Sequence, residues 1–550
     1  MQTEDDPRAD LRYGTTSRLL ADAARRLGSA EAIVGADLRL TYAQLDEAVS
    51  IAAAAIIGAG ILKGDRVAIW APNSPLWVVA ALGLQRAGAV LIPINTRFLG
   101  EEAAFILQKS QAKLLFTTTD FLGKDYPASL AEAAGGYGAQ WPVADLTALE
   151  HIVTLTGAPS RGTQSWYDFL ALGRVVAAAD VEDRAVSVDP DDLSDILFTS
   201  GTTGRPKGAM CTHGQTLRAY AVWNNVVGLR EGDRYLIVNP FFHGFGYKAG
   251  WLAAILAGAT ILPLQTLDVP TVLEVVRAER ITVLPGTPTL FQTMLEHPAY
   301  SRDGVDTLRL VVTGASTVPA ELLHRIRDEV GFEHIVTGYG LTETCGIVSM
   351  SRYTDPLDVV ASSAGRPLPG IEVRIVAPDG AVQPTGTEGE IVVRGYVLMR
   401  GYLDEPAQTA STIDAHGWLH TGDIGVLDEG GRLHITDRLK DMFIVGGFNA
   451  YPAEIEQILS RHPNIAQVAV IGVPDERLGE VGAAFVIARA GRTITSDDVV
   501  AFSRTNMANY KAPRHVYIVD ELPVNASGKV LKNHLRSRAV GGSPAELKGS

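Results

Sequence analysis

The sequence has little cysteine, no long hydrophobic run and no block of basic residues. Cys211 and Cys345 are the only cysteines among its 550 residues. Two cysteines exclude a disulfide framework, and their wide separation excludes the C-x-x-C spacing of zinc sites and redox motifs. We therefore expect the chain in a reducing compartment, the cytoplasm.

The chain also lacks the usual marks of membrane insertion, secretion and nucleic-acid binding. No apolar run reaches the roughly 18 residues of a membrane span, and the longest candidate, residues 51–62, is rich in alanine and glycine. The N-terminus is acidic and polar, whereas a signal peptide needs a basic start and an apolar core. The net charge of −14, from 48 basic and 62 acidic residues, argues against nucleic acid and anionic membranes as partners.

Length and composition predict a multidomain globular protein of the α/β class. A chain of 550 residues with 46% apolar content exceeds the size at which one hydrophobic core keeps growing. In the first third, apolar strands at 66–70 and 89–93 alternate with helical patterns at 77–87 and 101–109, which predicts layered, largely parallel sheets covered by helices. Short apolar runs continue this pattern at 235–239, 260–263, 282–284 and 308–312.

The pattern changes twice in the last third of the chain. From about Glu388, short alternating strands such as 389–395 predict a small β-rich subdomain. An α+β unit follows, with a helix at 452–461 and strands at 466–472 and 482–488. We expect a large N-terminal domain at 1–437, a hinge at 438–440, a small C-terminal domain at 441–540 and a frayed tail at 541–550.

Residues 199–208, TSGTTGRPKG, combine hydroxyl side chains, glycines and one lysine directly after an apolar run. Glycine lets backbone N–H groups approach an anion, and the hydroxyls and the lysine add donors and charge. The segment therefore predicts a phosphate-binding loop, but its spacing is not that of the P-loop, which disfavours a Walker-type NTPase. The expected phosphate contacts are Thr199, Ser200, Gly201, Thr202, Thr203, Gly204 and Lys207.

Further motifs follow this loop in a fixed order. They are PFFH at 240–243, GAS at 314–316, YGLTE at 339–343, TGD at 421–423, DRLKD at 437–441 and NASGK at 525–529. Together with the loop they resemble the adenylate-forming superfamily, which includes acyl-CoA synthetases, luciferases and the adenylation domains of peptide synthetases. The resemblance implies an ATP-dependent acyl-CoA synthetase that uses ATP, Mg²⁺ and CoA and converts a carboxylic acid first into acyl-AMP and then into acyl-CoA.

The resemblance also assigns the groups that manage charge in the first step. Glu343 is the expected Mg²⁺ ligand, Thr342 is expected to donate to the α-phosphate, and Thr199 is a second candidate near the ion. Lys529 resembles the lysine that bridges the substrate carboxylate and the α-phosphate. Lys207 and Lys529 lie far apart in sequence, so both serve one site only if the C-terminal domain closes over the N-terminal one.

Other motif residues are expected around the nucleoside and at the hinge. Tyr339 is expected to face adenine, Asp423 to accept from the ribose hydroxyls, and Arg438 to donate on the ribose side. Lys440 occupies the hinge position of DRLKD. The remaining expected nucleotide contacts are Gly314, Ala315, Ser316, Thr337, Gly338 and Gly340.

The acid and CoA are expected to reach the site from different sides. Gly446 and Gly447 are expected to form the wall of a pantetheine tunnel, with a simple turn as the alternative. His243 resembles a gate residue that moves when CoA enters, and we assign it no acid–base role. Lys248 either meets a keto group or second carboxylate of the substrate or pairs with an acid of the protein, and we favour the pair. The expected acid pocket consists of Phe242, His243, Phe245, Gly246, Tyr247, Lys248, Gly314, Gly338, Gly340 and Cys345.

Two segments, VNPFFHGFGYKAG at 238–250 and KDMFIVGGFNAYPAE at 440–454, look most like actinobacterial ligases for the indane propionate left by steroid ring degradation. A medium-chain fatty acid or aryl acid CoA ligase is the nearest alternative. An enzyme that adenylates acids for a carrier-protein thiol or for oxygen, and an inactive ligand-binding sensor, are alternatives of other kinds. The sequence does not decide the oligomeric state, for which a homodimer is our working hypothesis.

Overall fold

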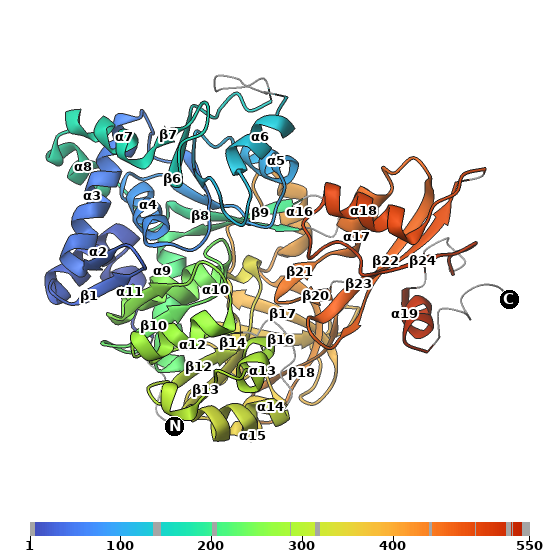
Figure 1. Cartoon of the computed structure of the whole chain (residues 1–550). Helices are drawn as coiled ribbons and strands as arrows, with labels where there is room; N and C mark the ends of the chain where they lie inside the picture. Colours follow the sequence, from blue (N-terminus) through green and yellow to red (C-terminus); the bar gives the residue numbers. More distant parts are fainter. Residues whose placement is uncertain are drawn as a thin grey trace.

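The computed structural model describes residues 6–135, 145–200, 206–286, 288–313, 320–438, 443–489, 491–523, 530 and 532–541. A large N-terminal region contains two mostly parallel sheets with helices around them and a small antiparallel sheet. A smaller C-terminal region, coloured orange and red, lies beside it (Figure 1). The predicted α/β fold class is confirmed.

The first sheet has seven strands in the order β7-β6-β5-β3-β4-β8-β9, and only the pair β8–β9 is antiparallel. The residues of β4 and β5 are all buried, as expected for parallel strands covered on both faces. The strand bounds are β3 (Arg66–Trp70), β4 (Val90–Pro93), β5 (Leu114–Thr118), β6 (His151–Thr156), β7 (Gln164–Ser165), β8 (Leu193–Ser200) and β9 (Pro206–Thr212).

Helix α4 (Pro75–Arg86), which joins β3 to β4, illustrates how local signals build this layer. The Ser74 side chain accepts a hydrogen bond from the Trp77 N–H, and Pro75 occupies the first turn, where its missing N–H costs nothing. The helix is buried from Trp77 to its end, so it lies inside the layered structure. The other helices between β2 and β10 are α3 (Tyr42–Gly58), α5 (Gly100–Ser110), α6 (Tyr126–Ala133), α7 (Trp166–Ala171), α8 (Ala178–Val186) and α9 (His213–Val227).

The second sheet has the order β10-β11-β1-β2 and continues from β10 through bridges at Val283 to β12 and β13. The predicted strand at 282–284 is reduced to these bridges. The strands are β1 (Glu31–Val34), β2 (Arg39–Thr41), β10 (Arg234–Ile237), β11 (Thr260–Pro263), β12 (Leu310–Thr313), β13 (His334–Tyr339), β14 (Ser349–Met350) and β15 (Arg366–Pro367). The helices around it are α1 (Ala9–Arg12), α2 (Thr16–Leu27), α10 (Gly244–Gly246), α11 (Ala253–Ala257), α12 (Val269–Ala278), α13 (Pro288–Glu296), α14 (Ala320–Arg325) and α15 (Leu357–Ser362).

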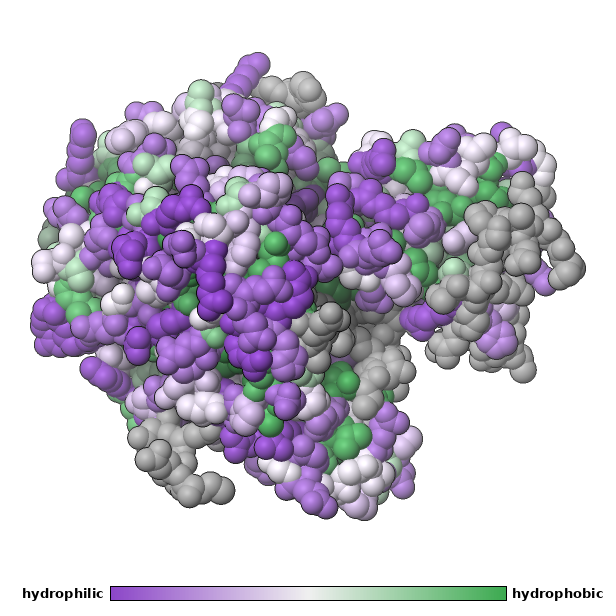
Figure 2. Space-filling model, turned by 60° about the horizontal axis from the view of Figure 1, so that its bottom comes forward, coloured by the Kyte–Doolittle hydropathy of each residue, from purple (hydrophilic) through white to green (hydrophobic). Residues whose placement is uncertain are grey.

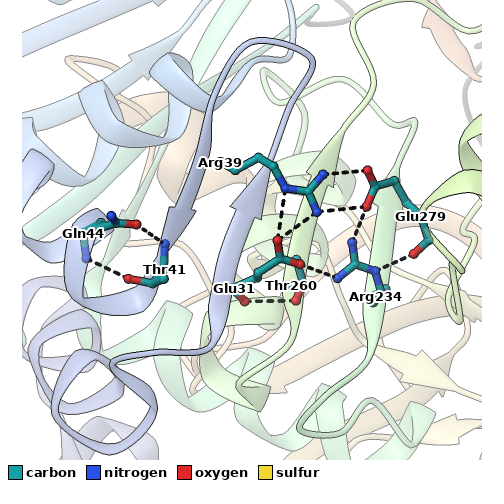
Figure 3. Close-up of polar contacts among 7 residues, drawn as sticks. All are labelled: Glu31, Arg39, Thr41, Gln44, Arg234, Thr260 and Glu279. Atoms are coloured by element: carbon teal, nitrogen blue, oxygen red, sulfur yellow. Dashed lines mark hydrogen bonds and ion pairs between the residues drawn. The ribbon is translucent and has the colours of Figure 1, made fainter.

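An ionic network closes one end of this second sheet (Figure 3). Arg39 on β2 and Arg234 on β10 both pair with Glu31 on β1 and with Glu279, the residue that follows α12. Figure 3 also shows the capping box of α3, in which Thr41 and Gln44 exchange hydrogen bonds. The network links the consecutive strands β1 and β2 to β10, which lies far from them in the sequence.

The β-rich subdomain begins earlier than the predicted Glu388. Its four antiparallel strands are β16 (Ile371–Val376), β17 (Gly389–Gly395), β18 (Leu419–Leu427) and β19 (Leu433–Arg438), with α16 (Pro406–Thr412) between β17 and β18. Strand β16 pairs with β17 in unbroken register from Ile371 to Val376. Its alternating sequence IEVRIV already carries the pattern of a half-buried strand.

The C-terminal region is the predicted α+β unit. Its sheet has the order β21-β20-β23-β22, with β24 paired to β23. The elements are β20 (Phe443–Val445), β21 (Phe448–Ala450), α17 (Pro452–Leu459), β22 (Ile465–Asp475), β23 (Gly479–Ala488), α18 (Ser496–Asn506), β24 (His515–Ile518) and α19 (Lys532–Gly541). The expected hinge residue Lys440 lies outside the described residues, so the boundary at 438–440 stays a prediction.

A buried ionic contact joins the two regions. The Lys511 ammonium lies 2.7 Å from Glu102 Oε1 on α5 and 2.6 Å from Glu454 Oε1 on α17. It also lies 4.4 Å from the centre of the Phe98 ring. The Lys511 side chain has no exposed surface, and therefore this contact depends on the C-terminal region keeping its position against α5.

The outer surface is that of a polar globular protein over the face in Figure 2, where hydrophilic residues predominate and apolar ones form small groups. Within the described ranges, no helix combines the length and the apolar character needed to span a membrane.

Candidate active site

The antiparallel strands β8 and β9 carry the two ends of the predicted phosphate loop. Thr199 lies opposite Lys207 in their register, and Ser200 lies opposite Pro206. The Lys207 ammonium donates to Gln408 Oε1 at 2.7 Å. The tip residues Gly201, Thr202, Thr203 and Gly204 and the side chain of Ser200 lie outside the described part of the chain.

Glu343 and Lys207 both contact the side chain of Tyr402. The Tyr402 hydroxyl donates to Glu343 Oε1 at 2.7 Å, and the Lys207 ammonium lies 5.4 Å from the centre of the Tyr402 ring. Burial raises the pKa of the Tyr402 phenol, and the Glu343 carboxylate raises it further, so the phenol stays protonated and donates. A carboxylate and an ammonium group thus converge beside the ends of the loop.

The oxygen groups around Glu343 fit a magnesium ion that arrives with a polyphosphate. Mg²⁺ is usually held by one or two carboxylates together with phosphate oxygens and water. Thr342 adjoins Glu343 in the short helix η5 (Thr342–Thr344). Over the described ranges, no cluster of three or more His, Cys, Asp or Glu side chains is arranged to hold a metal alone. One carboxylate beside a hydroxyl residue suits a metal whose remaining ligands are phosphate oxygens and water.

The segment from Tyr339 to Glu343 also contacts a second acidic residue, through its first side chain. The Tyr339 hydroxyl donates to Asp423 Oδ2 at 2.6 Å, and both side chains are buried. Arg438 lies opposite Asp423 in the β18–β19 ladder, but its side chain lies outside the described part. The loop from Tyr339 to Glu343 thus connects the predicted nucleoside residues to the predicted metal ligand.

The close packing of this loop explains one of its glycines. A Cβ atom at Gly340 would lie 2.4 Å from the Gly346 carbonyl oxygen, because the chain folds back on itself there. Thr337, Gly338 and Tyr339 are the last residues of strand β13, which ends immediately before Gly340. Gly314, Ala315 and Ser316, predicted to lie near the nucleotide, are outside the described residues.

Asn73, which lies just before α4, anchors the PFFH segment through its side chain. Its amide donates to the Asn239 carbonyl at 2.9 Å and accepts from the Phe241 N–H at 2.8 Å. Beyond this anchor the His243 side chain is exposed and accepts from the Phe245 N–H at 3.2 Å. An exposed histidine on an anchored turn is compatible with the predicted gate, which stays a prediction.

The C-terminal region places a glycine turn beside this segment. Gly446 and Gly447 have φ angles of 55° and 86° and form the two-residue turn between β20 and β21, as a type I′ hairpin turn requires. The ring of Phe448, the next residue, lies 6.3 Å from that of Phe242. Gly446 and Gly447 therefore form a hairpin turn, and their role in a pantetheine tunnel stays a prediction. Lys529 lies outside the described residues.

Three residues predicted to line the acid pocket form a closed cluster. Tyr247, Lys248 and Cys345 have no exposed surface, and Lys248 Nζ lies 2.9 Å from Asp195 Oδ1. The ion pair that the sequence favoured for Lys248 is thus present. The sequence did not reveal its partner, although Asp195 is an acid inside the apolar strand β8. Phe242 and Phe245 are half-buried, and Gly246 is buried, as the pocket prediction allows.

Sequence reasoning also missed Tyr402 and Gln408. Both contact residues of recognised motifs, Tyr402 with Glu343 and Gln408 with Lys207. Neither lies in a motif, and both follow β17 in the segment that packs against β9. Only the pairing of this segment with the sheet brings them to the site.

Comparison with known proteins gives matches along most of the chain. Residues 20–403 match the family model described as AMP-binding enzyme, and residues 454–529 match that of the AMP-binding enzyme C-terminal domain. The chain is 48% identical over 523 residues to the 3-[(3aS,4S,7aS)-7a-methyl-1,5-dioxo-octahydro-1H-inden-4-yl]propanoyl:CoA ligase of Rhodococcus jostii strain RHA1, which covers 95% of this chain and 98% of that protein.

Two further similarities extend this result. A protein of the same name from Mycobacterium tuberculosis is 47% identical over 527 residues, which cover 96% of this chain and 99% of that protein. Among solved structures, the amide bond synthetase McbA from Marinactinospora thermotolerans superposes with a TM-score of 0.81 at 28% identity, covering 95% of this chain and 99% of that one.

Proposed function

This chain belongs to the AMP-binding enzyme family, and from that premise we propose that it is an acyl-CoA synthetase for a bicyclic keto acid with a propanoate side chain. The acid is the one in the names of its two relatives, 3-(7a-methyl-1,5-dioxo-octahydro-1H-inden-4-yl)propanoate. The overall reaction joins this carboxylic acid to CoA and splits ATP into AMP and pyrophosphate. The identities of 48% and 47% over nearly the whole chain support this choice of acid.

The observation that supports the chemistry is the loop from Tyr339 to Glu343. Its first residue is hydrogen-bonded to Asp423, and its last is linked through Tyr402 to Lys207. Groups suited to a ribose and groups suited to a polyphosphate therefore lie at the two ends of one short segment. ATP has these two parts in the same order.

In the first step, an oxygen of the substrate carboxylate attacks the α-phosphorus of ATP, and the bond to the pyrophosphate oxygen breaks. The approaching groups are both anionic, so cationic and hydrogen-bond donor groups lower the barrier. Lys207 and the loop beside it are expected to bind the β- and γ-phosphates, and Lys529 is expected to bridge the two reacting groups. Glu343 would hold Mg²⁺, which supplies positive charge to the phosphate oxygens.

In the second step, the CoA thiolate attacks the acyl carbon, and the bond to the AMP oxygen breaks. The Gly446–Gly447 turn lies beside the PFFH segment, where side chains would narrow the approach of a thin pantetheine arm. His243 is exposed in the same segment and is expected to move aside as the thiol enters. Its role is steric, and the proton of the thiol leaves to solvent.

The setting of the enzyme is part of the same proposal. Both cysteines are free thiols, as expected in a reducing cytoplasm. Mg²⁺ is the proposed metal because the site offers oxygen ligands and few carboxylates. The proposed assembly is a homodimer, which light scattering of the purified chain tests directly.

The experiment is a pyrophosphate-release assay with Mg²⁺ and ATP, run with and without CoA and followed by mass spectrometry of the products. The panel contains the indanedione propanoate, medium-chain fatty acids and aryl acids such as ferulate. We expect continuous turnover, with AMP and acyl-CoA as products, for the indanedione propanoate only when CoA is present. Lys529→Ala should abolish it, whereas Lys532→Ala, a nearby lysine paired with Glu456 at 2.8 Å, should not.

Other outcomes identify the alternatives. Preference for a fatty or aryl acid retains the ligase and replaces the substrate. Pyrophosphate release that does not depend on CoA indicates another acceptor, such as a carrier-protein thiol, an alcohol or, as in the name of McbA, an amine. Binding of ATP without turnover of any acid, and without loss of ATP binding in Lys529→Ala, indicates a ligand-binding sensor.

A further inference from the structure

Lys248 lies in an unusual helical segment that follows the PFFH motif. It belongs to the π-helix η2 (Tyr247–Leu252), between α10 and α11, and such turns occur frequently at functional sites. Its ammonium and the Asp195 carboxylate are 2.9 Å apart, and neither side chain has exposed surface. A buried charge is tolerated only with a partner, so the two residues fix each other's position.

The pair continues into the loop that carries Glu343. The Lys248 ammonium donates to Cys345 Sγ at 3.4 Å, and the Thr216 hydroxyl lies 3.5 Å from the same sulfur. The Cys345 carbonyl accepts from the Tyr220 hydroxyl at 3.0 Å. Cys345 has a φ angle of 57°, which residues other than glycine adopt rarely and only where the surroundings hold them. The loop reverses at this held residue.

Electrostatics strengthens this contact. Burial by itself lowers the pKa of Lys248, but the Asp195 carboxylate and the two cysteines outweigh it and hold that pKa well above its ordinary value. Lys248 is therefore charged, and it donates to the Cys345 sulfur as a cation.

The cluster connects three segments that each carry a predicted site residue. Asp195 lies on β8, whose C-terminal end carries Thr199. Lys248 follows His243 within the α10–η2 segment. Cys345 follows Glu343 immediately after η5. One buried ammonium group is thus shared by the base of the phosphate loop, the acid-side helix and the metal-ligand loop.

We propose that Lys248 is a positioning residue for the nucleotide site: paired with Asp195, it holds Cys345 and thereby places Thr342 and Glu343 for Mg·ATP. This inference rests on the proposed function. It assigns Lys248 to the nucleotide side of the reaction and not to recognition of the acid. Lys248 touches no reacting group and acts through the loop.

The test is the equilibrium affinity for Mg·ATP, measured by calorimetry on the full chain, so it does not depend on knowing the acid. Lys248→Met with Asp195→Leu removes both charges together and leaves no buried charge unpaired. We expect this double variant to fold and to bind Mg·ATP about 10 to 100 times more weakly, the usual effect of losing a group that orients a metal ligand. Affinity for AMP without metal should change little.

A smaller substitution gives a second measurement if the double variant fails to fold. Cys345→Ala removes the acceptor of Lys248 and should weaken Mg·ATP binding in the same sense. Cys345→Ser keeps an acceptor at that position and should restore most of the affinity. A purely packing role predicts instead that alanine and serine behave alike.

The matched control is another buried ion pair, Arg309 with Asp233, which lies at the amino ends of β12 and β10. Arg309→Met with Asp233→Leu should change the stability of the protein without changing the affinity for Mg·ATP. The site lies at the opposite, carboxyl ends of these parallel strands.

Two results would overturn the inference. One is a folded Lys248→Met/Asp195→Leu variant, or a folded Cys345→Ala variant, with wild-type affinity for Mg·ATP. The other is unchanged Mg·ATP affinity together with a raised KM for the acid, which would return Lys248 to the acid pocket. Failure of the proposed function has a different signature, because wild-type protein then binds no Mg·ATP or turns over no acid.

Discussion

The contact between Lys511, Glu102 and Glu454 predicts that one lysine holds the C-terminal region against the N-terminal one. Replacing Lys511 by methionine keeps most of the side-chain volume and removes the charge. The two carboxylates, 2.7 Å and 2.6 Å from the ammonium in the native protein, then face each other without a counter-charge. The Lys511 side chain is 0% exposed and that of Glu454 is 6% exposed, so solvent compensates little.

The magnitude follows from this burial. Removing one partner of a buried ion pair typically costs about 3–5 kcal/mol, because the remaining charge stays buried. Replacing Glu102 by glutamine costs less, about 1–2 kcal/mol, because the Lys511–Glu454 pair survives and the amide oxygen still accepts. Since about 1.4 kcal/mol corresponds to a factor of ten, Lys511→Met should raise the fraction of molecules with a detached C-terminal region by roughly 10²–10⁴.

Native-state proteolysis between the two regions, together with hydrogen exchange along α5, measures that fraction. We expect cleavage and exchange to increase strongly in Lys511→Met and modestly in Glu102→Gln. The control is Lys109→Met on the same helix, because Lys109 pairs with Glu405 at 3.3 Å in a partly exposed position and such pairs contribute at most about 1 kcal/mol. Equal cleavage rates in Lys511→Met and the wild type would refute the argument.

Three further predictions concern the site and the stability of the protein. Glu343→Gln should lower kcat/KM for pyrophosphate release by about 10² or more, with partial recovery at high Mg²⁺, and Tyr402→Phe should have a smaller effect. Steady-state assays at several Mg²⁺ concentrations measure both effects. A fully active Glu343→Gln enzyme would contradict the assignment of Glu343 as the metal ligand. Asp423→Asn should raise KM for ATP about 10- to 100-fold, since a charged acceptor is worth roughly 1.5–3 kcal/mol, and an unchanged KM would exclude a ribose contact. Burial lowers the pKa of His213 from 6.5 to about 4, so between these pH values the unfolded chain binds a proton that the folded chain does not. The free energy of unfolding should therefore fall by about 3 kcal/mol as the pH drops from 6.5 to 4. Urea titrations of His213→Gln should show a smaller fall over the same pH range.

Much of the architecture is readable from local patterns. Strands such as β4 and β17 are runs of apolar or alternating residues, and α4 has its serine cap and proline at its start. The Gly446–Gly447 turn also follows from local chemistry, because two consecutive positive φ angles favour glycine. The β-rich subdomain starts at β16, before the predicted Glu388, and the alternating sequence IEVRIV is the local signal of that earlier start.

The candidate site divides in the same way. The motifs point to Lys207, Tyr339, Glu343 and Asp423 because each lies in a short segment where glycines and hydroxyl residues are gathered. Such a pattern is visible within a few residues of the sequence. No spacing predicts that Tyr402 links Glu343 to Lys207. These partners meet only after the segment following β17 pairs with β9.

The sequence by itself determined the α/β class, the two-part organisation, the family and the residue types proposed to contact the nucleotide, since each depends on patterns within a few residues. Only the tertiary structure decided which buried groups are partners: Lys248 with Asp195 and Cys345, and Lys511 with Glu102 across the two regions. A buried charge needs a counter-charge within a few ångströms, but that partner comes from whichever strand or helix the fold places beside it. The order of strands in the sheets and the docking of the C-terminal region set those neighbours.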